Sequence, residues 1–253
     1  VVREARVRDD GAGALLPGLR ARAARAIGRT FAGDAALGLA LLVADTRSLT
    51  PELRYSRAKI QLIANSKDMT AIAALESFAK QYPKHALAPR ALFDAAVYLE
   101  SAKHLPEALE NYRAVAALYP GNLDVAPVSL FREAMLEEQT GSWEQAKATL
   151  ESIPVKYPRT QAAIEAPFTI AQRYYQRGDK NAARGALAKA IVTYQTMIAN
   201  DSTAAFVPVC KFNILRGQLS LGQWDDALVT VDDLAAHFPK HPYTAQALLE
   251  GAK

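Results

Sequence analysis

Side chains that could carry out acid–base or metal chemistry are few and poorly placed in this sequence. The four histidines are His85, His104, His237 and His241. His237 and His241 have the four-residue spacing that aligns two metal ligands on one helix face, but Pro239 lies between them and interrupts that helix. The sequence has neither a His-Glu-x-x-His motif nor a Gly-x-Ser-x-Gly motif. We therefore expect no catalytic residue, no metal site and no cofactor.

The single cysteine and the glycines near the start of the chain give no stronger signal for chemistry. One cysteine, Cys210, excludes a disulfide framework within the chain. We interpret Cys210 as a packed small residue of a helix rather than as a nucleophile. Gly11, Gly13 and Gly18 have the wrong spacing for a dinucleotide-binding loop. The sequence predicts that the function is not catalytic.

The composition favours an all-helical protein. The chain has 253 residues, of which 50% are apolar, 22% are charged and 50 are alanine, the best helix former. This composition excludes a disordered chain and a membrane core. Residues 1–50 hold eight arginines and five acidic residues, whereas residues 51–253 hold 22 basic and 21 acidic residues and are almost neutral. Because the positive charge is confined to the start, we do not expect a nucleic acid partner.

An aromatic–proline pair recurs along the chain and marks an internal repeat. It is found at Tyr82-Pro83, Tyr119-Pro120, Tyr157-Pro158 and Phe238-Pro239. The gaps between these prolines are 37, 38 and 81 residues, and the last gap equals two periods. Phenylalanines recur in the same phase at Phe93, Phe131, Phe168 and Phe212. Agreement between independent markers indicates a repeated supersecondary unit.

Each period is expected to form two helices. A proline four residues before a marker phenylalanine, as at Pro89, Pro127 and Pro208, suits the first turn of the first helix. Gly141, Gly178 and Gly222 fall where that helix must end, in the left-handed conformation that favours glycine. The aromatic–proline pair ends the second helix.

The repeat phase extends over the whole chain. The helix pairs are expected at 14–46, 50–81, 86–118, 122–156, 160–199 and 203–237, followed by a last helix at 241–253. We expect one domain over residues 1–253, in which 50–253 form clear repeats and 1–49 form a divergent N-terminal repeat or cap.

These markers resemble the tetratricopeptide repeat family. The sequence Gly-x-Trp-x-x-Ala at 141–146 and 222–227 is similar to the family's turn and the start of its second helix. Ala96, Ala134 and Ala171 occupy the family's small-residue position in the first helix. The resemblance implies an all-α, right-handed solenoid of about six helix pairs plus a terminal helix. It also implies a non-catalytic scaffold or adaptor that binds other proteins or peptides.

Extra residues after the Tyr-Pro pair lengthen the period beyond the family's usual value. This longer form of the repeat is similar to that of bacterial envelope repeat proteins. Examples are the outer-membrane assembly lipoprotein BamD and the Tol-Pal coordinator CpoB. This resemblance implies a periplasmic or outer-membrane-associated role in envelope assembly. Two alternatives stay open, namely a cytoplasmic adaptor and the repeat domain of a larger membrane or secretion protein.

The N-terminal segment offers one route to a membrane. Arg22, Arg25 and Arg29 fall on one side of a predicted amphipathic helix. This basic stripe has two interpretations, namely peripheral contact with anionic lipid or a partner, and the solvated face of the first repeat. A lipid anchor removed from the chain is a further alternative, because Val1 is not an initiator methionine.

A curved repeat array has a concave face, on which a partner is expected to bind. The aromatic candidates for that face are Tyr55, Phe93, Phe131, Phe168 and Phe212. The polar candidates are Arg90, Gln172, Tyr175 and Arg216. Recurrent aromatics at this spacing also suit a core between helices, and polar residues also suit a solvated face, so both alternatives are kept. The lysine and asparagine with which some family members hold a partner's C-terminal carboxylate are absent from the matching positions, so we do not expect a chaperone-tail adaptor.

Overall fold

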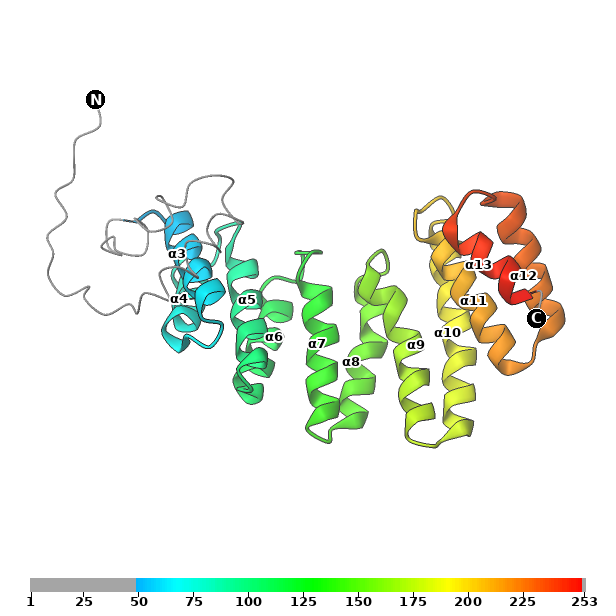
Figure 1. Cartoon of the computed structure of the whole chain (residues 1–253), viewed down its shortest axis with the longest axis horizontal. Coiled ribbons are helices and arrows are strands. Elements are labelled where there is room, and N and C mark those ends of the chain that lie inside the picture. The colour runs from blue at the N-terminus through cyan, green and yellow to red at the C-terminus, as the bar shows by residue number, and fades with distance from the viewer. Residues whose placement is uncertain (1–48, 252–253) are drawn as a thin grey trace, which may run out of the picture. The chain divides into compact units, whose positions relative to one another are not determined.

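A computed structural model describes residues 49–251, and this part of the chain contains eleven helices and no strand (Figure 1). The helices are α3 (Pro51–Ala64), α4 (Met69–Gln81), α5 (Ala88–Ser101), α6 (Leu105–Leu118), α7 (Ala126–Gln139), α8 (Trp143–Lys156), α9 (Gln161–Gln176), α10 (Lys180–Asn200), α11 (Val207–Leu221), α12 (Trp224–His237) and α13 (Pro242–Gly251). The predictions of an all-α fold, of five helix pairs from residue 50 to 237 and of a following helix are confirmed. The pair expected at 14–46 and the basic stripe lie outside the described residues.

The helices form two compact units with a boundary between Tyr119 and Pro120, and each unit is described by itself. In the first unit, α4 packs against α3 and α5, and α5 packs against α6. In the second unit, each helix from α7 to α13 packs against the next one. There α7 also contacts α9, and α11 contacts α13, so first helices of consecutive pairs stack as a repeat array requires. The single domain expected over residues 1–253 stays a prediction.

Local chemistry at the start of the first helices explains where they begin. Pro89, Pro127 and Pro208 lie in the first turns of α5, α7 and α11, as predicted. Proline is tolerated there because the first N–H groups of a helix have no partner within the helix. Pro167 differs, because it lies inside α9 rather than at its start.

A second device recurs two residues after the proline of each aromatic–proline pair. The side chains of His85, Asn122, Thr160 and His241 accept hydrogen bonds from backbone N–H groups two or three residues further on, at 3.1–3.4 Å. These acceptors satisfy donors that would otherwise be left unpaired before the first helical turn.

The turns between paired helices use the left-handed conformation that was predicted. Gly141, Gly178 and Gly222 have φ values of 89°, 80° and 77°. Lys103 takes the same role between α5 and α6 with a φ of 71°, although it is not a glycine. Side chains are disfavoured at positive φ, so glycine is the residue with the least strain at this turn.

Small residues at fixed positions let the helices approach closely. Ala108 and Ala146, at one place in consecutive second helices, are both fully buried, as is Ala134 in the first helix α7.

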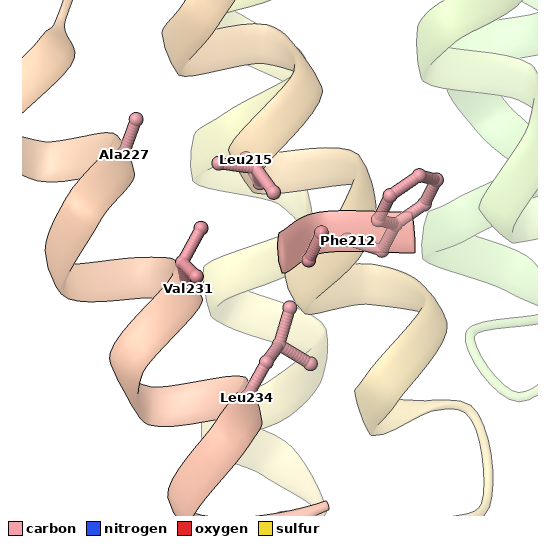
Figure 2. Close-up of a cluster of buried hydrophobic side chains, with 6 residues drawn as sticks. Phe212, Leu215, Ala227, Val231 and Leu234 are labelled. Atoms are coloured by element: carbon pink, nitrogen blue, oxygen red, sulfur yellow. The ribbon is translucent and has the colours of Figure 1, made fainter. Parts of the chain in front are cut away.

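Near the end of the described residues, α11 and α12 pack against each other through a hydrophobic cluster of Phe212, Leu215, Ala227, Val231 and Leu234 (Figure 2). Ala247 of α13 joins this cluster, so the terminal helix covers a face of α11 and α12.

Three helix pairs share a polar link between side chains twelve residues apart. The hydroxyl of Tyr112 donates to Glu100 at 2.7 Å in the pair α5–α6. The hydroxyl of Thr149 donates to Glu137 at 3.0 Å, and that of Thr230 donates to Gln218 at 2.8 Å, in the pairs α7–α8 and α11–α12. Each link satisfies a polar group close to the apolar interface between the two helices, which fixes how they face each other.

Candidate partner-binding groove

A groove of about 870 Å³ lies between α9 and α11 in the second unit, and we call it the α9–α11 groove. Side chains from four helices line it: Gln161, Ile164, Glu165, Phe168, Thr169, Ala171, Gln172 and Tyr175 of α9, Lys180, Ala183, Arg184 and Leu187 of α10, Val209, Asn213, Arg216 and Ser220 of α11, and Tyr243 of α13. Its volume lies within the range of ligand-binding clefts.

The lining residues of the two walls follow helical spacing. On α9, Glu165, Phe168, Gln172 and Tyr175 are separated by three, four and three residues, which puts them on one face. On α11, Val209, Asn213, Arg216 and Ser220 are separated by four, three and four residues and form a second stripe on one face. Two first helices therefore each turn one continuous stripe of side chains toward the same space.

Phe168 lines the groove and contacts side chains from two other helices. Its ring stacks on that of Tyr194 of α10, with centroids 6.1 Å apart and an interplanar angle of 23°. Tyr194 is buried, and its hydroxyl donates to the carbonyl of Ile164 at 2.7 Å. Burial raises the pKa of the Tyr194 hydroxyl, so it stays protonated and can donate this bond. The guanidinium of Arg216 lies 5.1 Å from the centre of the Phe168 ring, within cation–π range.

The charged side chains of the groove are mostly positive. Lys180 and Arg184 lie four residues apart in the first turns of α10, and Arg216 lies opposite on α11. Among the described residues none of these three cations makes an ion pair, although Arg184 donates to the carbonyl of Leu221 at 3.3 Å. The acidic side chain on the lining is Glu165, which accepts a hydrogen bond from Gln161 at 2.9 Å.

The structure brings together four of the nine residues proposed from the sequence. Phe168, Gln172, Tyr175 and Arg216 line the α9–α11 groove. Phe212 is placed differently, because it is 6% exposed and stacks on Tyr243 of α13 at 5.0 Å. It therefore belongs to the core cluster of Figure 2, which is the alternative kept for the marker aromatics.

The remaining candidates lie elsewhere. Phe131 is half-buried on α7 and is not part of the groove lining. Tyr55, Arg90 and Phe93 belong to the first unit, where Arg90 lies over the Phe93 ring at 5.7 Å. Phe93 also meets the buried ring of Tyr112 edge-on at 5.8 Å, which repeats the contact between a marker phenylalanine and a second-helix tyrosine seen at Phe168.

A buried carboxylate engages two of these candidates. Asp94 is 4% exposed and accepts hydrogen bonds from the Tyr55 hydroxyl at 2.8 Å and from Nε of Arg90 at 3.0 Å. Nζ of Lys59 is 2.7 Å from the same carboxylate. Burial and the nearby carboxylate raise the pKa of Tyr55, so its hydroxyl keeps its proton. The contacts from Tyr55 and Lys59 join α3 to α5, whereas Arg90 pairs with Asp94 within α5.

Several lining residues were not found from the sequence. Lys180 and Arg184 come from a second helix and Tyr243 from the terminal helix, whereas the sequence prediction concerns only the faces of first helices. Asn213 could have been found, because it lies three residues before Arg216 and so shares its face.

Reactive chemistry is limited in the described part of the chain. Cys210 is fully buried, and burial raises the pKa of its thiol to about 12, so it is packed as predicted and stays protonated at neutral pH. Between residues 49 and 251, no group of three or more His, Cys, Asp or Glu side chains is arranged to hold a metal ion. Within the same range, no helix has both the length and the apolar character needed to cross a bilayer.

Comparison with known proteins gives one family match. Residues 128–160 match the tetratricopeptide repeat family, a span that covers most of α7, all of α8 and the turn before α9. No curated protein matches the chain significantly. Residues 128–160 thus carry a tetratricopeptide signature within an all-helical arrangement of paired helices.

Three solved structures are similar to the chain. A tetratricopeptide repeat protein from Parabacteroides merdae is 14% identical, with a TM-score of 0.44 over 80% of this chain and 74% of that one. A thermophilic tetratricopeptide repeat protein from Thermus thermophilus is 24% identical, with a TM-score of 0.36 over 79% and 100%. The pilF protein of Pseudomonas aeruginosa is 17% identical, with a TM-score of 0.35 over 91% and 99%. The finer resemblance to proteins of the BamD or CpoB type finds no support in these matches.

Proposed function

We propose that this protein is a non-catalytic scaffold that binds a segment of another protein in the α9–α11 groove. The observation that carries the proposal is that Phe168, Gln172, Tyr175 and Arg216, four of the candidates predicted for a partner-binding face, line one groove. Grooves between helices bind partner helices or extended peptides through apolar anchors and side-chain hydrogen bonds. Phe168 and Tyr175 supply the anchors, and Gln172 and Arg216 supply the polar contacts.

The dimensions of the groove suit a short segment. The lining residues of α9 run from Gln161 to Tyr175, which is about 21 Å along the helix axis. An extended chain of about six residues covers this distance. Tyr175 is 68% exposed, so a large aromatic surface is available for a partner to bury.

The test compares two exposed aromatic residues of the second unit. Tyr175→Ala removes an aromatic from the groove, whereas Trp224→Ala removes one that is 64% exposed on α12, outside the groove lining. We expect a pull-down from the source organism to lose its partner with Tyr175→Ala and to keep it with Trp224→Ala, with unchanged melting temperatures for both. Equal retention by both variants would exclude the groove as the binding site.

An envelope location is a separate proposal, supported only by the sequence resemblance of the lengthened Tyr-Pro segment to envelope repeat proteins. It places the scaffold at the periplasmic face of the outer membrane, where it would take part in envelope assembly. Fractionation of source cells with an antibody against the chain tests it. Recovery in the cytoplasm would favour the alternative of a cytoplasmic adaptor.

A further inference from the structure

Several cations of the second unit that lie outside the α9–α11 groove pair with carboxylates of neighbouring helices or loops. Examples are Lys189 with Glu151 at 2.9 Å, Arg159 with Asp201 at 2.8 Å, and Arg173 with Glu138 at 2.9 Å.

At the groove, Lys180, Arg184 and Arg216 have no such carboxylate among the described residues. Lys180 and Arg184 share one side of α10, because four residues separate them. They lie at the start of α10, close to where α9 ends at Gln176, and Glu165 lies in the first half of α9. The lining of the groove therefore has a cationic end; Asp179, whose carboxylate caps α10 beside Lys180, is not part of the lining.

Arg216 is positioned before any ligand arrives. Its guanidinium lies over the Phe168 ring at 5.1 Å, and that ring is backed by the buried Tyr194. A guanidinium held on an aromatic ring keeps its edge free for a carboxylate, which it can bind through two parallel hydrogen bonds. Tyr175, Leu187 and Val209 supply apolar surface on the same lining.

We propose that the segment bound in the α9–α11 groove is acidic, with Asp or Glu side chains at the cationic end formed by Lys180, Arg184 and Arg216 and an apolar side chain against Phe168. This inference rests on the proposed function, because it names the chemistry of the ligand of that groove. Lys180 and Arg184 come from the second helix α10, and Arg216 comes from the first helix α11. Because residues 51–253 are almost neutral, the positive charge is local and fits an acidic peptide better than a long polyanion.

The test starts from random twelve-residue peptides displayed on phage and selected on the full chain. Selected peptides are synthesised with a fluorescent label, and their Kd is measured by fluorescence anisotropy. We expect them to contain more Asp and Glu than Lys and Arg. Replacing their acidic residues by Asn and Gln should weaken binding about tenfold or more.

Two charge-matched variants locate the contact. Lys180→Gln/Arg216→Gln removes two positive charges from the groove, whereas Lys156→Gln/Lys240→Gln removes two from outside its lining. We expect the first variant to weaken acidic peptides about tenfold or more and the second to leave their Kd unchanged within about twofold. Equal weakening by both variants would show a long-range charge effect and overturn the proposal.

A third variant separates failure of this inference from failure of the proposed function. If the selected peptides are neutral or basic and still lose binding with Tyr175→Ala, the groove binds peptides but the acidic assignment is wrong. If no peptide is selected, or none depends on Tyr175, both proposals fail. A fifteen-residue oligouridylate that outbinds every selected peptide and depends on Lys180 and Arg216 would overturn the assignment to a peptide.

Discussion

The guanidinium carbon of Arg216 lies 5.1 Å from the centre of the Phe168 ring, so a charged side chain of α11 contacts an aromatic side chain of α9. The buried ring of Tyr194 from α10 stacks on Phe168. Side chains of three consecutive helices thus meet at one phenylalanine. Because Tyr194 is also hydrogen-bonded to the backbone of α9, this part of the groove is preorganised rather than assembled by a ligand.

Truncation to alanine should lower the free energy of unfolding strongly at Phe212 and hardly at all at Tyr175. Phe212 is buried in the cluster of α11, α12 and α13, so Phe212→Ala is expected to lower the free energy of unfolding by about 3 kcal/mol or more. Tyr175 is exposed, so Tyr175→Ala should change it by no more than about 0.5 kcal/mol. Urea denaturation followed by circular dichroism measures both. A loss below about 1 kcal/mol for Phe212→Ala would contradict its placement in the core.

The buried carboxylate of Asp94 should contribute to the stability of the first unit. Asp94→Asn keeps the shape of the side chain but removes the charge that binds Lys59 and Arg90. Because both cations remain partly exposed, we expect a loss of about 1–3 kcal/mol rather than the larger value for a fully buried pair. Thermal unfolding compares it with Asp232→Asn at an exposed position of α12. Equal melting temperatures for the two variants would show that Asp94 does not hold α3 to α5.

Two glycines should respond to alanine with opposite signs. Gly222 has a φ of 77°, so Gly222→Ala forces a side chain into the left-handed region and should cost about 1–2 kcal/mol. Gly185 lies inside α10, and a Cβ atom there would meet nothing within 4 Å. Gly185→Ala should therefore stabilise the protein by about 0.5–1 kcal/mol through helix propensity. Chemical denaturation gives both values, and the same sign for the two variants would contradict the assigned backbone conformations.

The contact between Glu52 and His85 should be visible in the pH dependence of the first unit. The hydrogen bond from His85, at 2.8 Å, is the main cause that lowers the pKa of Glu52 from 4.5 to about 2. Because the folded-state pKa is depressed, the stabilisation is present above pH 4.5 and is lost as the pH falls toward 2. NMR titration of the Glu52 carboxyl carbon should give a midpoint near 2, and His85→Ala should move it back toward 4.5. An unshifted midpoint in the native chain would show that the contact does not persist in solution.

The thiol of Cys210 should report on opening of the α11 core. Burial raises its pKa to about 12, so little thiolate exists at pH 8 and a disulfide reagent must wait for the helix to open. We expect slow labelling of the native chain and faster labelling of Phe212→Ala, whose core is weakened. Immediate labelling of the native chain would contradict the burial of Cys210.

The sequence predicted best what short-range chemistry determines. Pro89 at a helix start and Gly141 at a helix end were identified correctly, because each residue satisfies a local backbone requirement. The sequence could not tell that Phe168 lines a groove whereas Phe212 is buried in the core, because both residues occupy the same position in the repeat. Their difference arises from what packs next to them, since α13 covers Phe212 whereas the space beside Phe168 stays open. The cations of α10 were missed for the same reason, because only the fold brings a second helix to the groove.

The most direct test of the central claim is photo-crosslinking from inside the groove. Benzoylphenylalanine is placed at position 175, with position 224 on α12 as the control, and crosslinked segments from source lysate are identified by mass spectrometry. We expect that one partner segment, rich in Asp and Glu, crosslinks at 175 and not at 224. Crosslinks that form only at 224, or at both positions without preference, would contradict a binding site in the α9–α11 groove.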